Sequence, residues 1–290
     1  ILLIALVAGC AIPIVLIYLL ELLRYKLEVR NDLERLTKVP ILGDVIMSHD
    51  LKGRRCLVVR ENDNDIMAET FRSIRTNLQF LLDGPDKKVI QFTSSTSGEG
   101  KTFVAANLAM SLSLLGKRVV VVGLDIRKPQ LLALLGLKPT KSGIVNFLCG
   151  AEADYELLDK QIIPSAIHRN MDLLPAGIIP PNPAELLSGS LLRDAIEYLS
   201  TKYDYVILDT PPVALVSDTL IIGALANMTI FVTRADYSPK ANFELINSLS
   251  RDRKLPKCNI VINAVDISKK RHSQQYGHYG HYGLYGGYGS

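Results

Sequence analysis

Cysteine is scarce in this sequence, and its four copies show none of the spacings that bind metals or build disulfide frameworks. Cys10, Cys56, Cys149 and Cys258 are scattered along 290 residues. Zinc sites and small disulfide-rich domains instead place cysteines at short, repeated intervals. The pattern argues against both of these classes and suits a protein that works in a reducing compartment.

A strong charge imbalance is also missing. The formal net charge is +4, and residues of both signs are interspersed along the chain. A nucleic-acid binder usually concentrates basic residues in a dense patch or stripe, so we expect no nucleic-acid partner. The 48% content of hydrophobic residues is high enough for a substantial folded core.

Charged residues are absent from Ile1 to Leu20. A helix needs about 20 apolar residues to cross a bilayer core, so residues 1–21 are expected to form a transmembrane helix, in which Pro13 is tolerated. The alternatives are a buried helix or a signal-peptide core, but a signal would have a basic start and a cleavage site. Arg24, Lys26 and Arg30 follow at once and predict that the rest of the chain faces the cytosol.

No Met opens the sequence, which starts inside the apolar run. We therefore expect it to be the C-terminal part of a longer protein. Gly and Pro punctuate Pro40 to Gly53, which predicts a linker within a juxtamembrane segment over residues 22–60. Residues 61–268 are expected to form the main domain, and residues 269–290 a tail.

This tail has almost no aliphatic residues that could form a hydrophobic core. Gln274 to Ser290 consists largely of Tyr, Gly, His and Ser, a composition that predicts disorder. A metal role for His278 and His281 is not expected from two histidines in such a segment. Five tyrosines recur at every third position: Tyr276, Tyr279, Tyr282, Tyr285 and Tyr288. They are either targets of chemistry or part of a low-complexity stacking segment.

The main domain shows alternating strand and helix patterns. Apolar residues from Asp63 to Leu82 recur at intervals of three and four, which predicts an amphipathic helix. Strands separated by longer amphipathic segments predict a doubly wound, mostly parallel α/β sheet, with its ligand site at the carboxyl ends of the strands. The expected strands cover residues 89–92, 119–122, 173–174, 205–208, 229–232 and 259–262.

A phosphate-binding loop, or P-loop, follows the first of these strands. Between Ser95 and Thr102 the sequence has a run of small residues, then a helix is expected to begin. Backbone N–H groups near Gly98 and Gly100, the helix N-terminus and the charge of Lys101 suit the β- and γ-phosphates, and the Thr102 hydroxyl suits Mg²⁺. The residues expected to contact nucleotide are Ser97, Gly98, Glu99, Gly100, Lys101, Thr102, Phe103 and Arg127.

Two other strands end close to acidic residues. Asp125 and Asp209 follow buried strands and are expected to bind Mg²⁺ together with Thr102, Asp125 also orienting or deprotonating an attacking hydroxyl. The alternative for either is a loop residue that caps the next helix. Arg127 pairs with phosphate or with a neighbouring acid. No Asn-Lys-x-Asp sequence indicates guanine recognition, so ATP is the expected nucleotide.

These features together resemble the bacterial tyrosine kinases of capsule and exopolysaccharide export, whose kinase domain is similar to the deviant P-loop ATPases of the Min and Par partitioning systems. The resemblance covers nearly the whole chain. Its three nucleotide motifs match Ser95 to Thr102, Val120 to Arg127 and Val206 to Pro212; a further segment matches Pro181 to Leu187; and an oligomerisation motif matches Glu69, Arg72 and Arg75. That charged triplet is otherwise an ordinary solvated helix face.

Two positions depart from related patterns. The family usually has an acid at the position of Gly123, and its loss leaves one carboxylate on that strand. The partitioning ATPases have a lysine where this chain has Thr96, a difference that fits the kinase branch.

The resemblance implies an ATP- and Mg²⁺-dependent tyrosine autokinase, with Lys101, Asp125 and Asp209 as catalytic residues and the five tail tyrosines of a neighbouring subunit as acceptors. It further implies a homo-oligomeric ring at the inner membrane with a cytoplasmic kinase domain. Its partners would be proteins of polysaccharide polymerisation and export and a tyrosine phosphatase. The alternatives are a switch ATPase that phosphorylates nothing and a non-catalytic assembly subunit that only binds nucleotide.

Overall fold

The computed structural model describes residues 26–27, 30–47, 56–61, 65–82 and 88–266. The expected transmembrane helix over residues 1–21 and the tyrosine-rich tail over residues 269–290 lie outside these ranges. Among the helices within them, none combines the length and the apolar character needed to cross a membrane.

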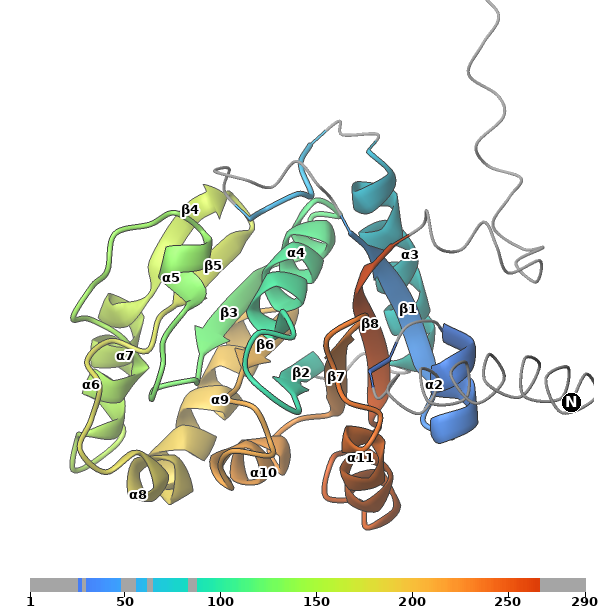
Figure 1. Ribbon diagram of the computed structural model, residues 1–290. Coiled ribbons are helices and arrows are strands. Elements are labelled where there is room, and N and C mark those ends of the chain that lie inside the picture. The colour runs from blue at the N-terminus through green and yellow to red at the C-terminus, as the bar shows by residue number, and fades with distance from the viewer. Residues whose placement is uncertain (1–25, 28–29, 48–55, 62–64, 83–87, 267–290) are drawn as a thin grey trace, which may run out of the picture.

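A single sheet organises the described part of the chain (Figure 1). Its strand order is β1-β8-β7-β2-β6-β3-β5-β4, and every neighbouring pair is parallel except β4 and β5. The strands are β1 (Ile41–Ile46), β2 (Lys88–Ser94), β3 (Val119–Gly123), β4 (Ile163–His168), β5 (Met171–Leu174), β6 (Tyr205–Asp209), β7 (Met228–Arg234) and β8 (Asn259–Val265). The predicted mostly parallel α/β sheet is confirmed.

Helices cover both faces of this sheet, as parallel strands with buried faces require. Alternate residues of the central strands pack on α3, α4 and α5 on one face and on the remaining helices on the other. The helices are α2 (Arg30–Leu36), α3 (Ile66–Leu81), α4 (Lys101–Ser113), α5 (Leu131–Leu134), α6 (Ile144–Leu148), α7 (Tyr155–Gln161), α8 (Pro183–Ser188), α9 (Ser190–Lys202), α10 (Asp218–Gly223) and α11 (Asn242–Arg251).

The predicted helix and the six predicted strands are all present, but two strands were not expected. The prediction of a linker from Pro40 to Gly53 is wrong for Ile41–Ile46, because this segment forms β1 and pairs in parallel with β8. As an edge strand it is only half buried, so it lacks the continuous apolar run of a central strand. The other unexpected strand, β4, is the antiparallel strand at the opposite edge.

Helix α4 is the element that positions the predicted site. It follows β2 directly after the loop at residues 95–100 and lies against the middle of the sheet (Figure 1). Of its 13 residues, all but Phe103 are buried. A helix enclosed to this extent holds its N-terminal turn in a fixed position over the carboxyl ends of β2, β6 and β3.

Candidate functional site

The predicted phosphate loop has the backbone geometry that an anion cradle requires. Gly98 and Gly100 have φ angles of +89° and +94°, a left-handed region that favours glycine. A Cβ atom on Gly100 would lie 2.1 Å from the side-chain nitrogen of Asn263, and one on Gly98 would lie 2.9 Å from the Tyr237 hydroxyl. Both glycines are therefore needed for conformation and for space.

Residues of the distant strands β7 and β8, and of the turn that follows β7, hold this loop from outside. Arg234 donates from Nη1 to the Gly98 carbonyl at 3.0 Å, the Tyr237 hydroxyl donates to the Ser97 carbonyl at 2.9 Å, and Asn263 donates from Nδ2 to the Glu99 carbonyl at 2.9 Å. All three of these bonds use loop carbonyl groups and none uses a loop N–H group. Sequence reasoning missed all three residues, although a polar Asn263 directly after the apolar run Ile260 to Ile262 was a usable signal.

Glu99 is a buried member of the loop and points back into the protein. Its carboxylate accepts a 2.7 Å hydrogen bond from the Thr96 N–H and a short one from the Ser238 hydroxyl. Burial raises the pKa of Glu99, while these hydrogen bonds oppose the rise. The side chain thus shapes the loop, so that only the backbone of Glu99 is placed to contact nucleotide.

Phe103 was also expected to contact nucleotide. Its ring packs edge-on against Phe71 of α3, with the ring centroids 6.0 Å apart. This residue can contribute its backbone to the first turn of α4, but its ring belongs to the contact between the two helices. Ser97, in contrast, lies exposed at the mouth of the loop.

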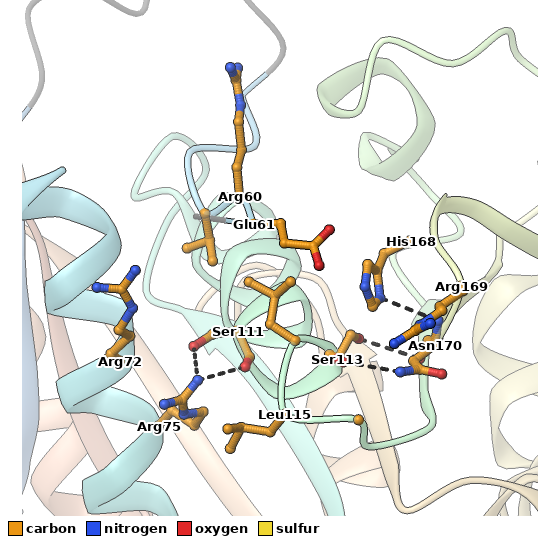
Figure 2. A pocket seen from close by; sticks show the side chains of 13 residues that line it. Arg60, Glu61, Arg72, Arg75, Ser111, Ser113, Leu115, His168, Arg169 and Asn170 are labelled. Carbon is orange, nitrogen blue, oxygen red and sulfur yellow. Dashed lines mark hydrogen bonds between the residues drawn. The ribbon is translucent and has the colours of Figure 1, made fainter. Parts of the chain in front are cut away.

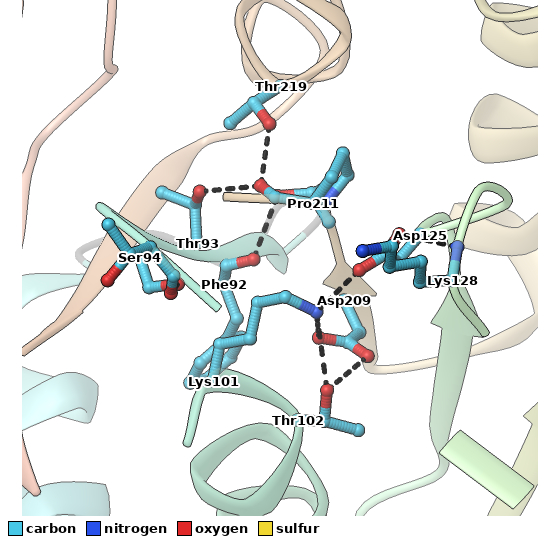
Figure 3. Close-up of polar contacts among 12 residues, drawn as sticks. Phe92, Thr93, Ser94, Lys101, Thr102, Asp125, Lys128, Asp209, Pro211 and Thr219 are labelled. Atoms are coloured by element: carbon cyan, nitrogen blue, oxygen red, sulfur yellow. Dashed lines mark hydrogen bonds and ion pairs between the residues drawn. The ribbon is translucent and has the colours of Figure 1, made fainter. Parts of the chain in front are cut away.

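The predicted catalytic residues meet at the first turn of α4 (Figure 3). Lys101 Nζ lies 3.1 Å from Asp125 Oδ2 and 3.2 Å from Asp209 Oδ1. The Thr102 hydroxyl donates to Asp209 Oδ2 at 2.8 Å and accepts from Lys101 Nζ at 3.3 Å. The sequence named all four residues as site residues, and the structure brings them together.

The charges in this cluster are strongly coupled because the side chains are buried. Burial acts to lower the pKa of Lys101, but the nearby carboxylates of Asp209 and Asp125 outweigh it and raise that pKa above its ordinary value. Full burial raises the pKa of Asp209, and Lys101 and Thr102 oppose this rise. Lys101 is therefore held as an ammonium group between two acids.

The strand register explains why the acids converge. Phe92 of β2 and Gly123 of β3 both lie opposite Asp209 of β6. Asp125 lies two residues beyond β3, and its N–H donates to the Asp209 carbonyl at 3.0 Å. At the end of β3, Gly123 offers no side chain, and a Cβ atom there would lie 3.3 Å from the backbone nitrogen of Ala176.

These oxygens suit a magnesium ion, although they do not form a dense acidic cluster. In the described ranges no group of three or more His, Cys, Asp or Glu residues could hold a metal ion. The cluster offers two carboxylates and one hydroxyl, and Mg²⁺ is commonly held by one or two carboxylates together with phosphate oxygens and water. The donor set therefore fits Mg²⁺ in the company of a nucleotide.

Arg127 lies at the edge of this cluster, and the structure pairs it with a neighbouring acid. Its Nε donates to Asp218 Oδ2 at 2.8 Å and its Nη2 to Asp218 Oδ1 at 3.3 Å. The hydrogen bond to Asp218 raises the pKa of Arg127. Of the two alternatives for Arg127, the acid is the partner seen in this structure, and Asp218 had not been identified from the sequence.

The charged triplet of the predicted oligomerisation motif lies on α3, away from the phosphate loop. Arg72 Nη1 pairs with Glu69 Oε2 at 2.6 Å, whereas Arg75 Nη1 donates to the carbonyl and the hydroxyl of Ser111 at 2.9 and 3.2 Å. Arg75 thus contacts the last turn of α4 and does not lie on a purely solvated face.

Known proteins with similar sequences identify the family of this chain. A family model described as an AAA domain matches residues 87–260. The chain is 31% identical over 224 residues to the tyrosine-protein kinase YwqD of Bacillus subtilis, covering 77% of this chain and 92% of that protein. It is 30% identical over 259 residues to a putative tyrosine-protein kinase, EpsB, of Ralstonia solanacearum, covering 85% of this chain and 34% of the relative.

A solved structure shows the same fold. The kinase domain of the Escherichia coli tyrosine kinase ETK has a TM-score of 0.69 and 26% sequence identity, over 78% of this chain and 90% of that one. The chain spans about a third of the length of the Ralstonia relatives.

Proposed function

We propose that this chain, which belongs to the family of bacterial tyrosine-protein kinases, transfers the γ-phosphoryl group of ATP to tyrosine hydroxyl groups. The observation that carries this proposal is the placement of Lys101 between Asp125 and Asp209 at the mouth of a glycine-shaped loop. Phosphoryl transfer depends mainly on position and charge neutralisation, and this cluster offers both.

The nucleotide would lie along the loop from Ser97 to Thr102. Backbone N–H groups of the loop and of the first turn of α4 would hold the phosphates, and Lys101 would turn from its carboxylate partners toward the β- and γ-phosphates. Thr102, Asp209 and Asp125 would hold Mg²⁺, which when bound neutralises phosphate charge. Arg127, fixed by Asp218, would stand at the edge of the site as a further cation.

Asp125 is the residue we assign to the acceptor. One of its oxygens contacts Lys101, and the other accepts a 3.1 Å hydrogen bond from the Lys128 N–H. A carboxylate fixed in this way can accept the proton of an incoming tyrosine hydroxyl, or orient that hydroxyl. With glycine at position 123, Asp125 is the carboxylate available for this task at the end of β3.

The acceptors we propose are the five tail tyrosines from Tyr276 to Tyr288. The chain leaves β8 at Val265, at the sheet edge that carries the phosphate loop, since Asn263 already contacts Glu99. Tyr276 follows about ten residues later, and such a segment extends at most about 35 Å. A tail of Gly and Tyr can enter a site in extended form without unfolding anything. We propose that it enters the site of a neighbouring subunit.

The same proposal places the protein in an assembly at the inner membrane. Residues 1–21 would span the membrane, and residues 61–268 together with α2 and β1, which belong to the same sheet and core, would form the cytoplasmic kinase domain. We assign Glu69, Arg72 and Arg75 to contacts between subunits of a ring. Phosphorylation of the tails would add about 1.5 to 2 negative charges per tyrosine, and the subunits would then repel one another. The ring would regulate proteins of exopolysaccharide polymerisation and export, and a tyrosine phosphatase would reverse the reaction.

A mixing experiment tests whether the tail tyrosines are phosphorylated and whether the phosphate is transferred between subunits. One variant, Lys101→Ala, keeps all tail tyrosines but loses the phosphate-binding lysine; a second variant keeps Lys101 and changes the five tail tyrosines to Phe. Each is incubated alone and then together with Mg-ATP, and phosphotyrosine is located by mass spectrometry. We expect no tail phosphotyrosine in either variant alone and phosphate on the tail of the Lys101→Ala chain in the mixture.

Three outcomes would contradict the proposal in different ways. Tail phosphorylation of the parent chain without any in the mixture would mean that each chain phosphorylates itself. ATP consumption by the parent without phosphotyrosine anywhere would identify a switch ATPase. Binding of ATP without turnover would identify a non-catalytic assembly subunit. The lack of a carboxylate at Gly123 would then explain the missing activity.

A further inference from the structure

A polar pocket lies at the opposite end of α4 from the phosphate loop. Its volume is about 390 Å³, and its walls come from the last turn of α4, the segment at residues 59–61, α3 and the turn between β4 and β5 (Figure 2). From Lys101 to Ser111 the helix rises by about 15 Å, so this pocket is separate from the nucleotide site. The proposed phosphoryl transfer does not use this pocket, although two of its residues, Arg72 and Arg75, also belong to the triplet that we assign to subunit contacts.

The lining of this pocket is strongly basic. Four arginines, Arg60, Arg72, Arg75 and Arg169, are among its lining residues, against a single acid, Glu61. Arg72 is paired with Glu69, but within the described ranges neither Arg60 nor Arg169 takes part in an ion pair. Like charges gathered in one hollow repel each other, so an anion bound there would relieve that repulsion.

Arg75 is the cation whose Nε atom is buried. Its Nη1 caps the α4 terminus by donating to Ser111, but its buried Nε has no hydrogen-bond partner among the described residues. Burial lowers the pKa of Arg75, the neighbouring Arg72 lowers it further, and Glu69 opposes them. Capping of α4 accounts for the position of one Arg75 nitrogen, Nη1. It does not account for the other arginines that line the pocket.

Neutral groups complete the lining. The Asn170 N–H donates to His168 Nδ1 at 3.3 Å, which leaves His168 Nε2 as the protonated nitrogen and a donor. Leu114 and the exposed Leu115 add an apolar edge. The pocket therefore combines guanidinium groups, a further donor and a small apolar surface, and its volume lies within the range of small-ligand sites.

We propose that this pocket binds the dianion of a phosphate group, either as a phosphotyrosine side chain or as free phosphate. Guanidinium groups bind phosphate oxygens through paired N–H donors, and several of them around one hollow are typical of phosphate recognition. The apolar edge at Leu115 favours an aromatic ester, whose ring can lie against it. This inference depends on the pocket alone and holds whether or not the chain proves to be a kinase.

Calorimetric titration of the full chain tests the proposal. The probes are O-phospho-L-tyrosine, inorganic phosphate and L-tyrosine, and saturating Mg-ADP keeps the phosphate loop occupied throughout. The pocket variant is Arg60→Gln combined with Arg169→Gln, both at exposed positions where folding is not at risk. The matched control is Arg193→Gln combined with Arg251→Gln, which removes the same charge from exposed positions outside the pocket.

We expect the parent and the control to bind phosphotyrosine equally and the pocket variant to bind it at least about tenfold more weakly, since each charge-assisted hydrogen bond contributes about that factor. L-Tyrosine should not bind. A tighter affinity for phosphotyrosine than for inorganic phosphate would identify the aryl ester as the ligand, and equal affinities would identify free phosphate. No binding of either probe, or the same loss in both double variants, would overturn the site.

A single deeper substitution gives an independent check. Arg75→Lys keeps the positive charge but loses the planar fork of donors, so we expect it to weaken phosphotyrosine binding as well. Thermal unfolding of this variant shows whether α4 remains intact. Unchanged binding in a folded Arg75→Lys variant would contradict the role assigned to the buried guanidinium.

Discussion

The side-chain amide of Asn263 lies against the phosphate loop and donates a 2.9 Å hydrogen bond to the carbonyl of Glu99. It occupies the space that a side chain on Gly100 would need, since a Cβ atom there would lie 2.1 Å from Asn263 Nδ2. Strand β8 thus sets the conformation of a loop that precedes it by more than 150 residues.

Replacing Gly100 with Ala should therefore cost more than a change of backbone preference. Gly116 has a similar φ of +78°, but a Cβ atom there would meet nothing within 4 Å, so Gly116→Ala serves as the matched control. We expect the control to lose about 1 kcal/mol of unfolding free energy from backbone strain alone. Gly100→Ala should lose a further 1 to 3 kcal/mol, roughly the cost of overpacking a buried site, and ATP affinity should fall with it.

Urea unfolding and nucleotide titration measure these effects. Adding Asn263→Ala to Gly100→Ala should restore part of the stability, because it removes the atom in conflict. Equal losses for Gly100→Ala and Gly116→Ala would show that Asn263 moves aside at no cost.

Removal of Lys101 should leave Asp125 and Asp209 facing each other without a cation. Because Asp209 is only 1% exposed, we expect Lys101→Ala to lose about 3 kcal/mol of unfolding free energy in the absence of metal, as is usual when a buried pair is broken. Added Mg²⁺ should stabilise this variant more than it stabilises the parent, since the cation replaces the lost ammonium group. Phosphoryl transfer should fall by at least about 100-fold.

Thermal unfolding as a function of Mg²⁺ concentration distinguishes this account from a general loss of packing. If Mg²⁺ stabilised the parent and Lys101→Ala equally, the two acids would not form the cation site that we infer.

The pair between Arg127 and Asp218 should contribute more to stability than an exposed pair of the same type. The side chain of Asp218 is 1% exposed and that of Arg127 is 38% exposed. Arg127→Gln leaves a buried carboxylate without its cation, and because Arg127 is partly exposed we expect a loss of only about 2 kcal/mol. Arg118→Gln is the control, since its pair with Asp204 is 3.9 Å long and exposed on both sides; its loss should be below about 0.5 kcal/mol.

Chemical denaturation at neutral pH provides the two values. Similar losses for the two arginine variants would mean that solvent reaches Asp218 and screens it.

The buried thiol of Cys258 should make the free energy of unfolding depend on pH. Burial raises the pKa of its thiol from 9.0 to about 12. The folded state therefore favours the neutral thiol: this stabilisation is fully present below about pH 9 and is lost as the pH rises toward 12. Between pH 8 and pH 10.5 the parent should lose roughly 2 kcal/mol that Cys258→Ala does not lose.

Alkylation gives a second measurement of the same burial. Iodoacetamide at pH 8.5 should modify the exposed Cys149 rapidly and Cys258 only as fast as the protein opens, because the thiolate is the reacting species. Equal alkylation rates for Cys149 and Cys258 in the native protein would contradict the raised pKa.

Local sequence patterns predicted most of the central sheet and failed at its edges. The central strands are continuous apolar runs because both of their faces are buried, so they stand out from the helices between them. Strand β1 contains Gly43 and Asp44 and follows Pro40, features shared with ordinary loops. Its strand conformation comes from pairing with β8, a partner that lies more than 200 residues along the chain.

The same division applies to the site. Glu99 and Phe103 were expected among the nucleotide contacts because of their position in the motif, but their side chains turn toward Ser238 and Phe71. A motif specifies where the backbone runs, whereas the direction of a side chain depends on which neighbours have room for it. Arg75 shows this as well, since only the packing of α3 on α4 brings it to Ser111.

By itself the sequence determined the phosphate loop, since glycines, lysine, threonine, strand and helix follow one another within a short contiguous segment whose chemistry is local. It also determined the class of fold, through the alternation of apolar strands with amphipathic helices. The sequence also named Asp125 and Asp209 as site residues, but only the tertiary structure decided how they are arranged around Lys101. Only the tertiary structure identified Asn263 behind Gly100 and Asp218 beside Arg127. Those contacts depend on the order of strands in the sheet. Strand order arises from packing between segments that lie far apart in the sequence, so a local sequence pattern does not predict it.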